Sequence, residues 1–539
     1  MLRDAAVSLS LANLCFVKVW ARTLSSAGAY FNEFPIVYAG IIIDVLVLGA
    51  LFFAAVTIVR RSRAAFLMNV ARWGFLIAML TALNGIALLI VTLSGINFAT
   101  LLGRNIAYFA GLGLTALAVL VAIRVRNLLV HFAPRVLLVL LPFVLITFSQ
   151  TTWKLSQESG VVHAANAAQP PTQIMRNKPA TRVLWIIFDE MDQRMSFSER
   201  PPSVTLSELD RLRAESVYAV NAFPPAPITY MSLPALITGR LVASVAPARA
   251  DELMVRFDGE KTPVGWSSQP NVFSEARQSG FHTGLAGWCH PYCEVIGKSL
   301  TKCDEVKENA SADFTLKASM FSHAQGLIST IPLLQQATIP IIQRVAFFNQ
   351  IVTTGERRKY TVRYNRVLES ALNAAVDPNL DLVFVHSPAP HPPGIYDRAK
   401  DDFSLESKNG YVDNLELVDR TIGELRRAME RTGMWEKTTV IISADHWWRT
   451  EMWSRGPFWT REDAEFSHGK MDHRIPFLIK LSGQRNQLTY SSAFNTIVTH
   501  DLILALMSGK VSKPGEVTTW LDQHRTISDS PYNRDELLP

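Results

Sequence analysis

Six residues of the kinds that bind metal ions or phosphate come at or just past the ends of short apolar segments in this chain of 539 residues. The segments are RVLWIIF (182–188), DLVFVH (381–386) and TTVIISA (438–444). The six residues are Asp189, Glu190, His386, His391, Asp445 and His446. Carboxylate and imidazole groups together are a typical ligand set for a hard or borderline divalent cation. If the fold brings the segment ends together, these residues can form a metal-dependent site.

The segment ITYMSLPALITGR (228–240) offers a hydroxyl group that could act as a nucleophile. Thr229 is followed three residues later by Ser232, and the segment closes with Thr238 and Gly239. A hydroxyl is a weak nucleophile at neutral pH, so a metal ion or a base must activate it. Thr229 also fits the amino-terminal cap of a helix. Both roles are compatible, because the amino end of a helix favours an anion.

The segments that must position these side chains alternate between strand-like and helix-like patterns. Helical spacing appears over 203–217, with a capping-box start at Ser203, and again over 272–280. This alternation predicts an α/β fold with a mainly parallel central sheet. In such sheets ligands bind beyond the carboxyl ends of the strands, where the acids and histidines are expected to converge. Within that set we interpret His386 as a plain core residue of its strand.

The first 150 residues contain apolar runs close to the roughly 20 residues that cross a bilayer core. We predict an α-helical membrane domain of about five spans, at 5–24, 37–59, 74–96, 106–123 and 128–149. Buried core helices are the alternative, chiefly for the first and last of these, which contain charged residues. The predicted organisation is a transmembrane domain over 1–150, a linker over 151–181 and a globular domain over 182–539.

Positive charges beside the expected spans predict their orientation, because basic loops stay on the cytoplasmic side. Arginines gather between the second and third spans and between the fourth and fifth: Arg60, Arg61, Arg63, Arg72, Arg124, Arg126 and Arg135. We therefore expect the amino terminus inside and the residues after 150 outside. No cleavable signal peptide is apparent, since the first span lacks a small-residue cleavage site.

The net charge and the cysteine spacing bear on the partners and the kinds of site to expect. The formal net charge of +6 is modest for this length and comes without a long basic run, so nucleic acid is not an expected partner. Cys289, Cys293 and Cys303 lie close together, in a spacing that does not match a zinc finger. A disulfide in an oxidising compartment is favoured over a zinc site. Which two of the three cysteines pair is left open.

Five sequence blocks resemble motifs of the alkaline phosphatase/sulfatase superfamily, in the same order. The blocks are FDE (188–190), TYMSLPALITG (229–239), PAPHPP (388–393), SADHWW (443–448) and SHGKMDHRIPFLI (467–479). TYMSLPALITG is similar to the arylsulfatase signature, with Thr229 in the nucleophile position. Because apolar spans precede the blocks, the layout resembles the phosphoethanolamine transferases and the lipoteichoic acid synthases. The resemblance implies that residues after 182 form a sulfatase-like α/β domain.

The resemblance also implies roles for individual residues. Thr229 and His391 are expected to be catalytic. The expected metal ligands are Thr229, Asp445, His446 and one or both of Asp189 and Glu190, with zinc or manganese as the ion. Contacts with the substrate are expected from Ser232, His290, His468, Lys470 and His473.

The sequence departs from the sulfatases at the nucleophile. Sulfatases oxidise a cysteine or serine to formylglycine, and Thr229 cannot form that aldehyde, so sulfate ester hydrolysis is not expected. A phospho-threonine intermediate is expected instead. The predicted function is transfer of a phosphorylated headgroup, of phosphoethanolamine or phosphoglycerol type, from a phospholipid donor to an envelope glycan or lipid acceptor. The predicted place is the bacterial inner membrane, with a periplasmic catalytic domain.

Two readings compete with this one. The chain could be a phosphodiesterase or phosphatase with water as the acceptor, or a non-catalytic envelope assembly protein. Two segments bear on the membrane: DHWWRTEMWSRGPFW (445–459), with four of the twelve tryptophans, is interpreted as a lipid-facing lid or as core. The apolar segment 326–352 is interpreted as an insertion that packs on the spans or as core helices.

Overall fold

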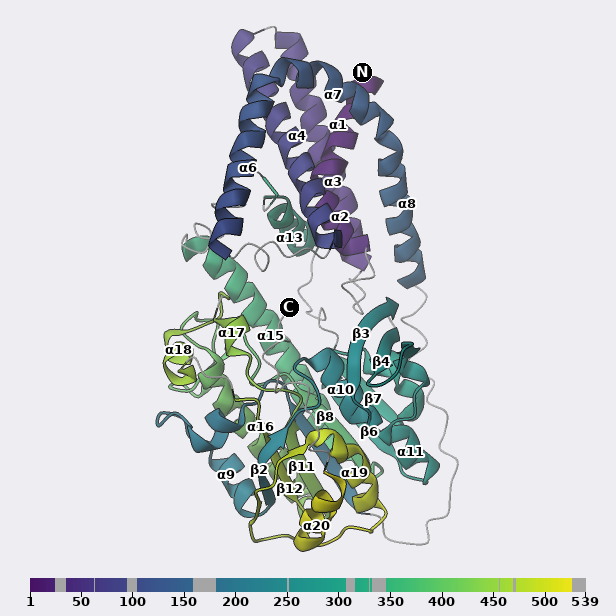
Figure 1. Cartoon of the computed structure of the whole chain (residues 1–539), viewed down its shortest axis with the longest axis vertical. Helices are drawn as coiled ribbons and strands as arrows, with labels where there is room; N and C mark the ends of the chain where they lie inside the picture. The colour runs from purple at the N-terminus through teal and green to yellow at the C-terminus, as the bar shows by residue number, and fades with distance from the viewer. Residues whose placement is uncertain are drawn as a thin grey trace. The chain divides into compact units, whose positions relative to one another are not determined.

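The computed structural model describes residues 1–24, 35–62, 64–94, 104–158, 181–249, 252–306, 316–328, 330–331, 346–454, 456–468 and 472–525. The chain forms two compact units, and each is described by itself (Figure 1). The helical unit comprises Met1–His163 and Ala312–Asn349, and the α/β unit comprises Ala164–Ser311 and Gln350–Pro539. Each unit is therefore built from two separate stretches of chain.

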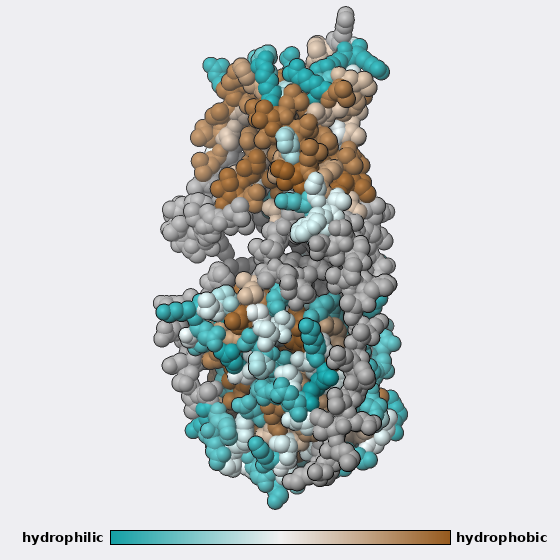
Figure 2. Space-filling model, turned by 90° about the vertical axis from the view of Figure 1, so that its right-hand side faces the viewer, coloured by the Kyte–Doolittle hydropathy of each residue, from teal (hydrophilic) through white to brown (hydrophobic). Residues whose placement is uncertain are grey.

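The helical unit has an apolar interior and an apolar exterior. Its helices are α1 (Leu2–Cys15), α2 (Val17–Leu24), α3 (Pro35–Ser62), α4 (Ala65–Ser94), α6 (Arg104–Arg124), α7 (Arg126–Val139), α8 (Leu141–Glu158) and α13 (Leu316–Ile328). Side chains of α1, α4 and α7 form a core cluster of Leu11, Leu14, Cys15, Ala78, Ala82 and Leu137. Figure 2 shows a broad hydrophobic face on this unit. Large apolar side chains of the unit are exposed, among them Leu51, Leu120 and Val139. Such a surface suits lipid better than water.

Two described helices are long and apolar enough to cross a membrane, Tyr38–Ser62 and Ala65–Ile90. A third span is possible if the pair Ala116–Arg124 and Arg126–Val139, bent by 92°, counts as one. The five expected spans are thus not confirmed in the described residues. The first expected span is two helices that meet at Phe16, ahead of the charged Lys18. The last one is divided between α7 and α8.

Helix α13 belongs to the helical unit although it follows the first half of the α/β unit in sequence. It packs on α3, where a Cβ atom added to Gly40 would lie 2.5 Å from Ser319 Oγ. One helical turn further along each helix, His323 Nδ1 lies 2.9 Å from Asp44 Oδ2. The expected insertion at 326–352 is described only over 326–328, 330–331 and 346–352. The described part up to residue 331 lies in the helical unit.

A nine-stranded mixed sheet forms the centre of the α/β unit. Its strands are β1 (Arg182–Phe188), β2 (Val217–Phe223), β6 (Thr283–Trp288), β7 (Lys302–Val306), β8 (Leu382–Ser387), β11 (Thr438–Ala444), β12 (Ile475–Lys480), β13 (Leu488–Tyr490) and β14 (Phe494–Asn495). The order is β13-β2-β12-β11-β1-β8-β6-β7, and β14 also pairs with β2. Within this sheet, among the described residues, only β12 pairs antiparallel, with β11 and β2. The prediction of a mainly parallel central sheet is confirmed.

The register of β1 explains why the site residues meet. Phe188, the last residue of β1, pairs with Ala444 at the end of β11 and with Ser387 at the end of β8. Asp189 and Asp445 therefore leave the sheet at the same edge. Every residue of β1, β8 and β11 is buried, which is why these strands read as continuous apolar runs.

Helices and smaller strands surround the central sheet. The helices are α9 (Ser207–Ala214), α10 (Thr229–Thr238), α11 (Val272–Gln278), α12 (Tyr292–Val295), α15 (Ala346–Ala375), α16 (Tyr411–Arg431), α17 (Thr450–Trp453), α18 (Arg461–Ser467), α19 (Thr499–Met507) and α20 (Pro514–His524). Short turns are η3 (Arg194–Ser198), η4 (Trp266–Ser268), η5 (Gly297–Ser299), η6 (Trp435–Lys437) and η7 (Thr496–Val498). Small sheets comprise β3 (Val242–Arg249), β4 (Glu252–Phe257) and β5 (Val264–Gly265), and β9 (Tyr396–Asp397) with β10 (Asp402–Phe403).

The amino end of α9 differs from its sequence prediction. The capping-box pattern at Ser203 predicts a start there, but the helix begins at Ser207 and its N-cap, Leu206, makes no side-chain cap. A carboxylate from α16 replaces that cap, because the Leu209 amide donates to Asp419 Oδ1 at 2.8 Å. A tertiary contact has thus overridden the local signal.

The cysteine cluster forms one disulfide. Cys293 in α12 is bonded to Cys303 in β7, so the bridge ties a short helix to the edge strand of the sheet. Cys289 is buried and keeps its thiol outside the disulfide. The expectation of a disulfide is therefore met, and the pairing that the sequence left open is assigned.

Candidate active site

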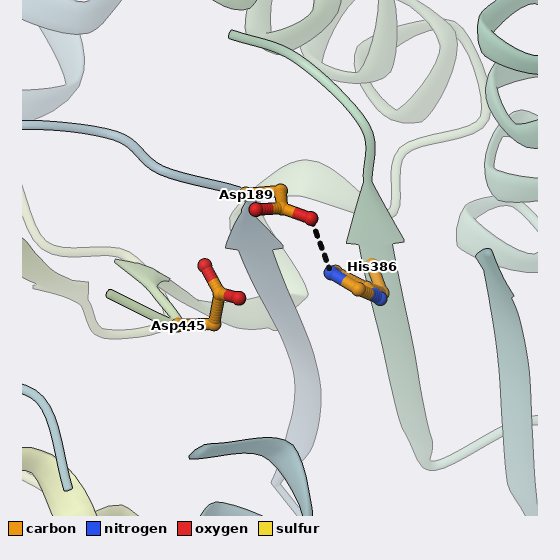
Figure 3. A group of neighbouring side chains, drawn as sticks. All are labelled: Asp189, His386 and Asp445. Carbon is orange, nitrogen blue, oxygen red and sulfur yellow. Dashed lines mark ion pairs between the residues drawn. The ribbon is translucent and has the colours of Figure 1, made fainter. Parts of the chain in front are cut away.

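Three buried residues at the carboxyl ends of neighbouring strands could hold a metal ion: Asp189, His386 and Asp445. One ligand atom of each lies within 4.8 Å of the others. Figure 3 shows Asp189 at the tip of β1, turned towards His386 on β8, with Asp445 facing them from beyond β11. The group therefore forms where the register of the three strands requires it.

The ring of His386 presents an unprotonated nitrogen to this group. Its Nδ1 lies 3.0 Å from the carbonyl oxygen of Trp288, which can only accept a hydrogen bond, and 3.0 Å from the Tyr292 hydroxyl, which can accept as well as donate. A proton on Nδ1 satisfies the carbonyl, and we assign it there. Burial is the main reason that the pKa of His386 falls to about 4, and the ring is neutral at pH 7. Nε2 then has a lone pair, 3.7 Å from Asp189 Oδ2.

His446 repeats the pattern on the other side of Asp189. Its Nδ1 lies 3.0 Å from the carbonyl oxygen of Trp447 and so carries the proton. Burial first, and then the charge of Arg449, lower the pKa of His446 well below its usual value. The unprotonated Nε2 lies 3.3 Å from Asp445 Oδ2 and 3.7 Å from Asp189 Oδ1.

Lone pairs and carboxylates that face one another in a buried site fit a cation. Asp445 Oδ2 and His386 Nε2 are buried and have no hydrogen-bond partner among the described residues. Burial, and then the charge of Asp189, raise the pKa of Asp445 to about 8, which shows how unfavourable two carboxylates are here without positive charge. Two carboxylates and two imidazoles suit a divalent metal ion. Each imidazole ring is held in place by the hydrogen bond from its Nδ1 to a backbone carbonyl.

The hydroxyl of Thr229 lies beside His446. Its Oγ1 is 3.2 Å from His446 Nε2, and its side chain is nearly buried. Thr229 is the first residue of α10, and Ile228 is the N-cap, so the expected capping role of Thr229 is not observed. Gly239 ends the helix in the left-handed conformation, with φ of 69°. The hydroxyl therefore lies at a helix amino terminus, where the helix dipole favours an anion.

Ser232 and His290 are buried beside the candidate site. The Ser232 hydroxyl donates to the backbone carbonyl of Asp445 at 2.6 Å, so it ties α10 to the end of β11. His290 Nε2 lies 3.3 Å from the carbonyl oxygen of Thr229. Both residues contact backbone at the site, and their expected contacts with a substrate stay predictions.

The two adjacent acids after β1 have different partners. Glu190 has a left-handed backbone, with φ of 62°, and its side chain is fully buried. One carboxylate oxygen is ion-paired with Arg449 Nε, and the other accepts a hydrogen bond from Trp453 Nε1 at 2.7 Å. Asp189 is in the possible metal group and Glu190 is not. Sequence alone could not separate two neighbouring carboxylates.

His391 lies among aromatic side chains. Its ring stacks on Tyr360, with ring centroids 5.8 Å apart, and meets Trp288 and Trp453 edge to face. Burial, followed by the charge of Arg449, lowers the pKa of His391 to about 3. The charge of Arg449 thus acts on both His391 and His446, so all three residues belong to one electrostatic neighbourhood.

The late histidine-rich block is only partly connected to the site. His473 packs on Trp447, the residue after His446, with ring centroids 4.2 Å apart. His468 is exposed at the end of α18, and no described contact joins it to the Asp189 group. Lys470 lies outside the described residues.

From the sequence, His386 is interpreted as a core residue, and Arg449 and Trp453 have no individual role beyond belonging to the segment 445–459. The structure adds His386 to the metal group and joins the other two to Glu190. The position of His386 near the carboxyl end of a central strand was a usable signal, because side chains there lie at the ligand edge of the sheet. Nothing comparable marked Arg449, whose partner is 259 residues away.

A family model described as Sulfatase matches residues 181–508. The chain belongs to the sulfatase family. This match confirms the superfamily that the sequence blocks suggested. No curated protein matches the chain.

Solved structures similar to this sulfatase-family chain differ in activity. The PsFucS1 sulfatase from Pseudoalteromonas sp. is 15% identical, with 61% of this chain and 68% of that chain covered and a TM-score of 0.38. The lipoteichoic acid synthase LtaP from Listeria monocytogenes is 12% identical, with coverage of 62% and 73% and a TM-score of 0.37. The phosphonate monoester hydrolase of Agrobacterium radiobacter is 13% identical, with coverage of 62% and 78% and a TM-score of 0.34.

Proposed function

We propose that this sulfatase-family protein is a membrane-anchored, metal-dependent phosphotransferase that forms a phospho-threonine intermediate on Thr229. The observation that carries the proposal is the position of the Thr229 hydroxyl at the start of α10. Its Oγ1 lies 3.2 Å from His446 Nε2, which itself lies 3.3 Å from Asp445 Oδ2 in the possible metal group. A nucleophile, a helix end that favours an anion and a cation site are thus adjacent.

The proposed metal ligands are Asp189, His386, Asp445 and His446, and the proposed ion is zinc or manganese. Each imidazole donates its Nδ1 proton to a backbone carbonyl, an arrangement that orients metal-binding histidines. A divalent cation bound there would supply positive charge that stabilises a phosphoryl group during transfer. Compared with the set expected from sequence, His386 is added, and Glu190 and the Thr229 hydroxyl are left out.

The proposed reaction has two half-reactions. In the first, Thr229 Oγ1 bonds to the phosphorus of the donor headgroup and the bond from phosphorus to the glyceride oxygen breaks. The proton that Thr229 loses is delivered to the departing glyceride oxygen, and His391, which is neutral before reaction, is the proposed carrier. In the second, an acceptor hydroxyl bonds to phosphorus, the bond to Thr229 breaks, and a proton returns to Thr229.

The donor and the location are proposed from the anchor. Two apolar helices long enough to span a membrane support a phospholipid donor, because an anchored domain stays near the headgroups. An envelope glycan or lipid is the proposed acceptor, with the α/β unit on the periplasmic side of a bacterial inner membrane. Thr229 supports phosphoryl rather than sulfate transfer, since threonine cannot form the formylglycine of sulfatases.

The test is the mass of the Thr229 peptide from the full chain purified from native membranes. A phosphorylated headgroup on Thr229, absent from Thr229→Ala, is expected, and its mass would identify the headgroup as phosphoethanolamine, phosphoglycerol or another. Thr229→Ser, which keeps the hydroxyl, should retain the adduct. Unmodified Thr229 in zinc-loaded protein under turnover with phospholipid would contradict the proposed intermediate.

The acceptor is tested separately. Transfer predicts that turnover rises with an added acceptor that carries a hydroxyl group. Turnover that is independent of any acceptor and releases a free phosphorylated headgroup would instead indicate a hydrolase. Protein that binds no divalent metal and carries no adduct would favour a non-catalytic role in envelope assembly.

A further inference from the structure

Arg449 is a cation at the edge of the candidate active site with part of its hydrogen-bonding capacity unused. Its side chain is 19% exposed, whereas Glu190, to which it is paired, is fully buried. Among the described residues, the only partner of the Arg449 side chain is Glu190, through Nε. Both Nη atoms therefore remain to bind another group. A guanidinium group offers them as a planar fork that matches two oxygens of a phosphate.

The position of Arg449 is fixed by two groups. Glu190 pairs with Arg449 through one oxygen, and Trp453 Nε1 donates to its other oxygen at 2.7 Å. The left-handed backbone of Glu190 is uncommon for a residue with a side chain, and strained conformations of this kind cluster at functional sites. This backbone gives neighbouring carboxylates separate tasks, Asp189 in the metal group and Glu190 on the arginine.

We propose that Arg449 binds the phosphoryl group that Thr229 receives, and that Glu190 and Trp453 are positioning residues that aim its guanidinium. This inference rests on the proposed function, which supplies the phosphoryl group. A structural ion pair is the alternative explanation of the contact. Arg200 provides a comparison, because it is 18% exposed and paired with Asp210 at 2.7 Å, outside the candidate site.

Binding of inorganic phosphate to the zinc-loaded full chain separates the two explanations without turnover. Arg449→Gln should weaken phosphate binding by roughly 10- to 100-fold, the usual range for losing hydrogen bonds to a charged group. Arg449→Lys should recover part of the affinity, since it restores the charge but not the fork. Arg200→Gln should leave phosphate affinity unchanged, and all three variants should keep the zinc content of the parent.

Glu190 is tested by Glu190→Gln and Trp453→Phe. Both should keep zinc and weaken phosphate binding less than Arg449→Gln does, because the guanidinium is still present but no longer aimed. Loss of zinc from Glu190→Gln would make Glu190 a metal ligand and overturn the positioning role. The proposal would be overturned if Arg449→Gln kept the phosphate affinity of the parent or lost its bound zinc. It would also be overturned if the parent protein bound no phosphate.

The outcome is distinguishable from failure of the proposed function. Phosphate binding that depends on Arg449, in a protein that never carries an adduct on Thr229, would leave the arginine assignment standing and reject the covalent intermediate. An adduct that forms at the parental rate in Arg449→Gln would support the covalent intermediate and reject the arginine assignment.

Discussion

Replacing Ser232 by alanine should weaken metal binding although Ser232 is not a proposed ligand. Its hydroxyl donates to the backbone carbonyl of Asp445 at 2.6 Å and fixes the start of the segment that carries Asp445 and His446. Removing the donor leaves that buried carbonyl unpaired, at a cost of about 1–3 kcal/mol in stability. Residues that orient metal ligands typically contribute about 10- to 100-fold to metal affinity.

Ser216 is a matched control for this change. Its side chain is equally buried, and its hydroxyl donates to the carbonyl of Leu212, also at 2.6 Å, in a part of the α/β unit away from the site. Ser216→Ala should cost less stability, because the Glu215 amide still donates to that carbonyl at 3.1 Å, and it should leave metal affinity unchanged. A zinc competition titration and a thermal unfolding curve on the two variants give both quantities.

Two outcomes would contradict an effect of the Ser232 hydrogen bond on metal binding. If Ser232→Ala loses stability but keeps parental zinc affinity, as Ser216→Ala should, the Ser232 bond is only structural. If Ser232→Thr, which keeps the hydroxyl, loses as much zinc affinity as the alanine variant, crowding and not the hydrogen bond controls the site.

Three further predictions follow from contacts elsewhere. Burial raises the pKa of Asp192 from 3.8 to about 7, so its contribution to stability is complete below pH 4 and is lost as the pH rises through 7. Asp192→Asn should therefore be more stable to heat than the parent at pH 8 but not at pH 4. Equal differences in thermal midpoint at the two pH values would contradict this. Cys293→Ser with Cys303→Ser opens a loop of ten-residue separation and should cost about 2–3 kcal/mol under oxidising conditions, measured by denaturant unfolding with and without reductant, which should affect only the parent. Gly40→Val should destabilise the helical unit in detergent because its Cβ meets Ser319, whereas Gly74→Val, with no atom within 4 Å of that position, should change its thermal midpoint little.

Much of the fold could be predicted because the buried strands are recognisable as continuous apolar runs in the sequence. The runs before Asp189 and Asp445 are apolar throughout, as strands covered on both faces are, and each ends in an acid. Their common edge follows from parallel pairing, so the convergence of Asp189 and Asp445 was predictable too. The register that sets them side by side, Phe188 against Ala444, was not, because it depends on packing over 256 residues of separation.

The finer parts of the site could not be predicted from local patterns. Adjacent acids have the same chemistry, and only the left-handed turn at Glu190 and its distant partner Arg449 separate their roles. His386 looked like a core residue because it is one by burial, and only the carbonyl of Trp288 shows which nitrogen faces Asp189. The predicted start of α9 was wrong for the same reason, since Asp419 supplies the cap from another helix.

The return of α13 to the helical unit has a consequence for dissecting the protein into fragments. A chain that begins at residue 181 would remove α3 but keep α13, whose Ser319 and His323 pack on Gly40 and Asp44. Such a fragment would carry an apolar helix stripped of its partner, and it is expected to aggregate for that reason alone. Because β8 follows α13 in the chain, the ribosome also makes this helix of the helical unit before the centre of the sheet can close. The helical unit therefore has all of its described partners for α13 before the α/β unit has all of its strands.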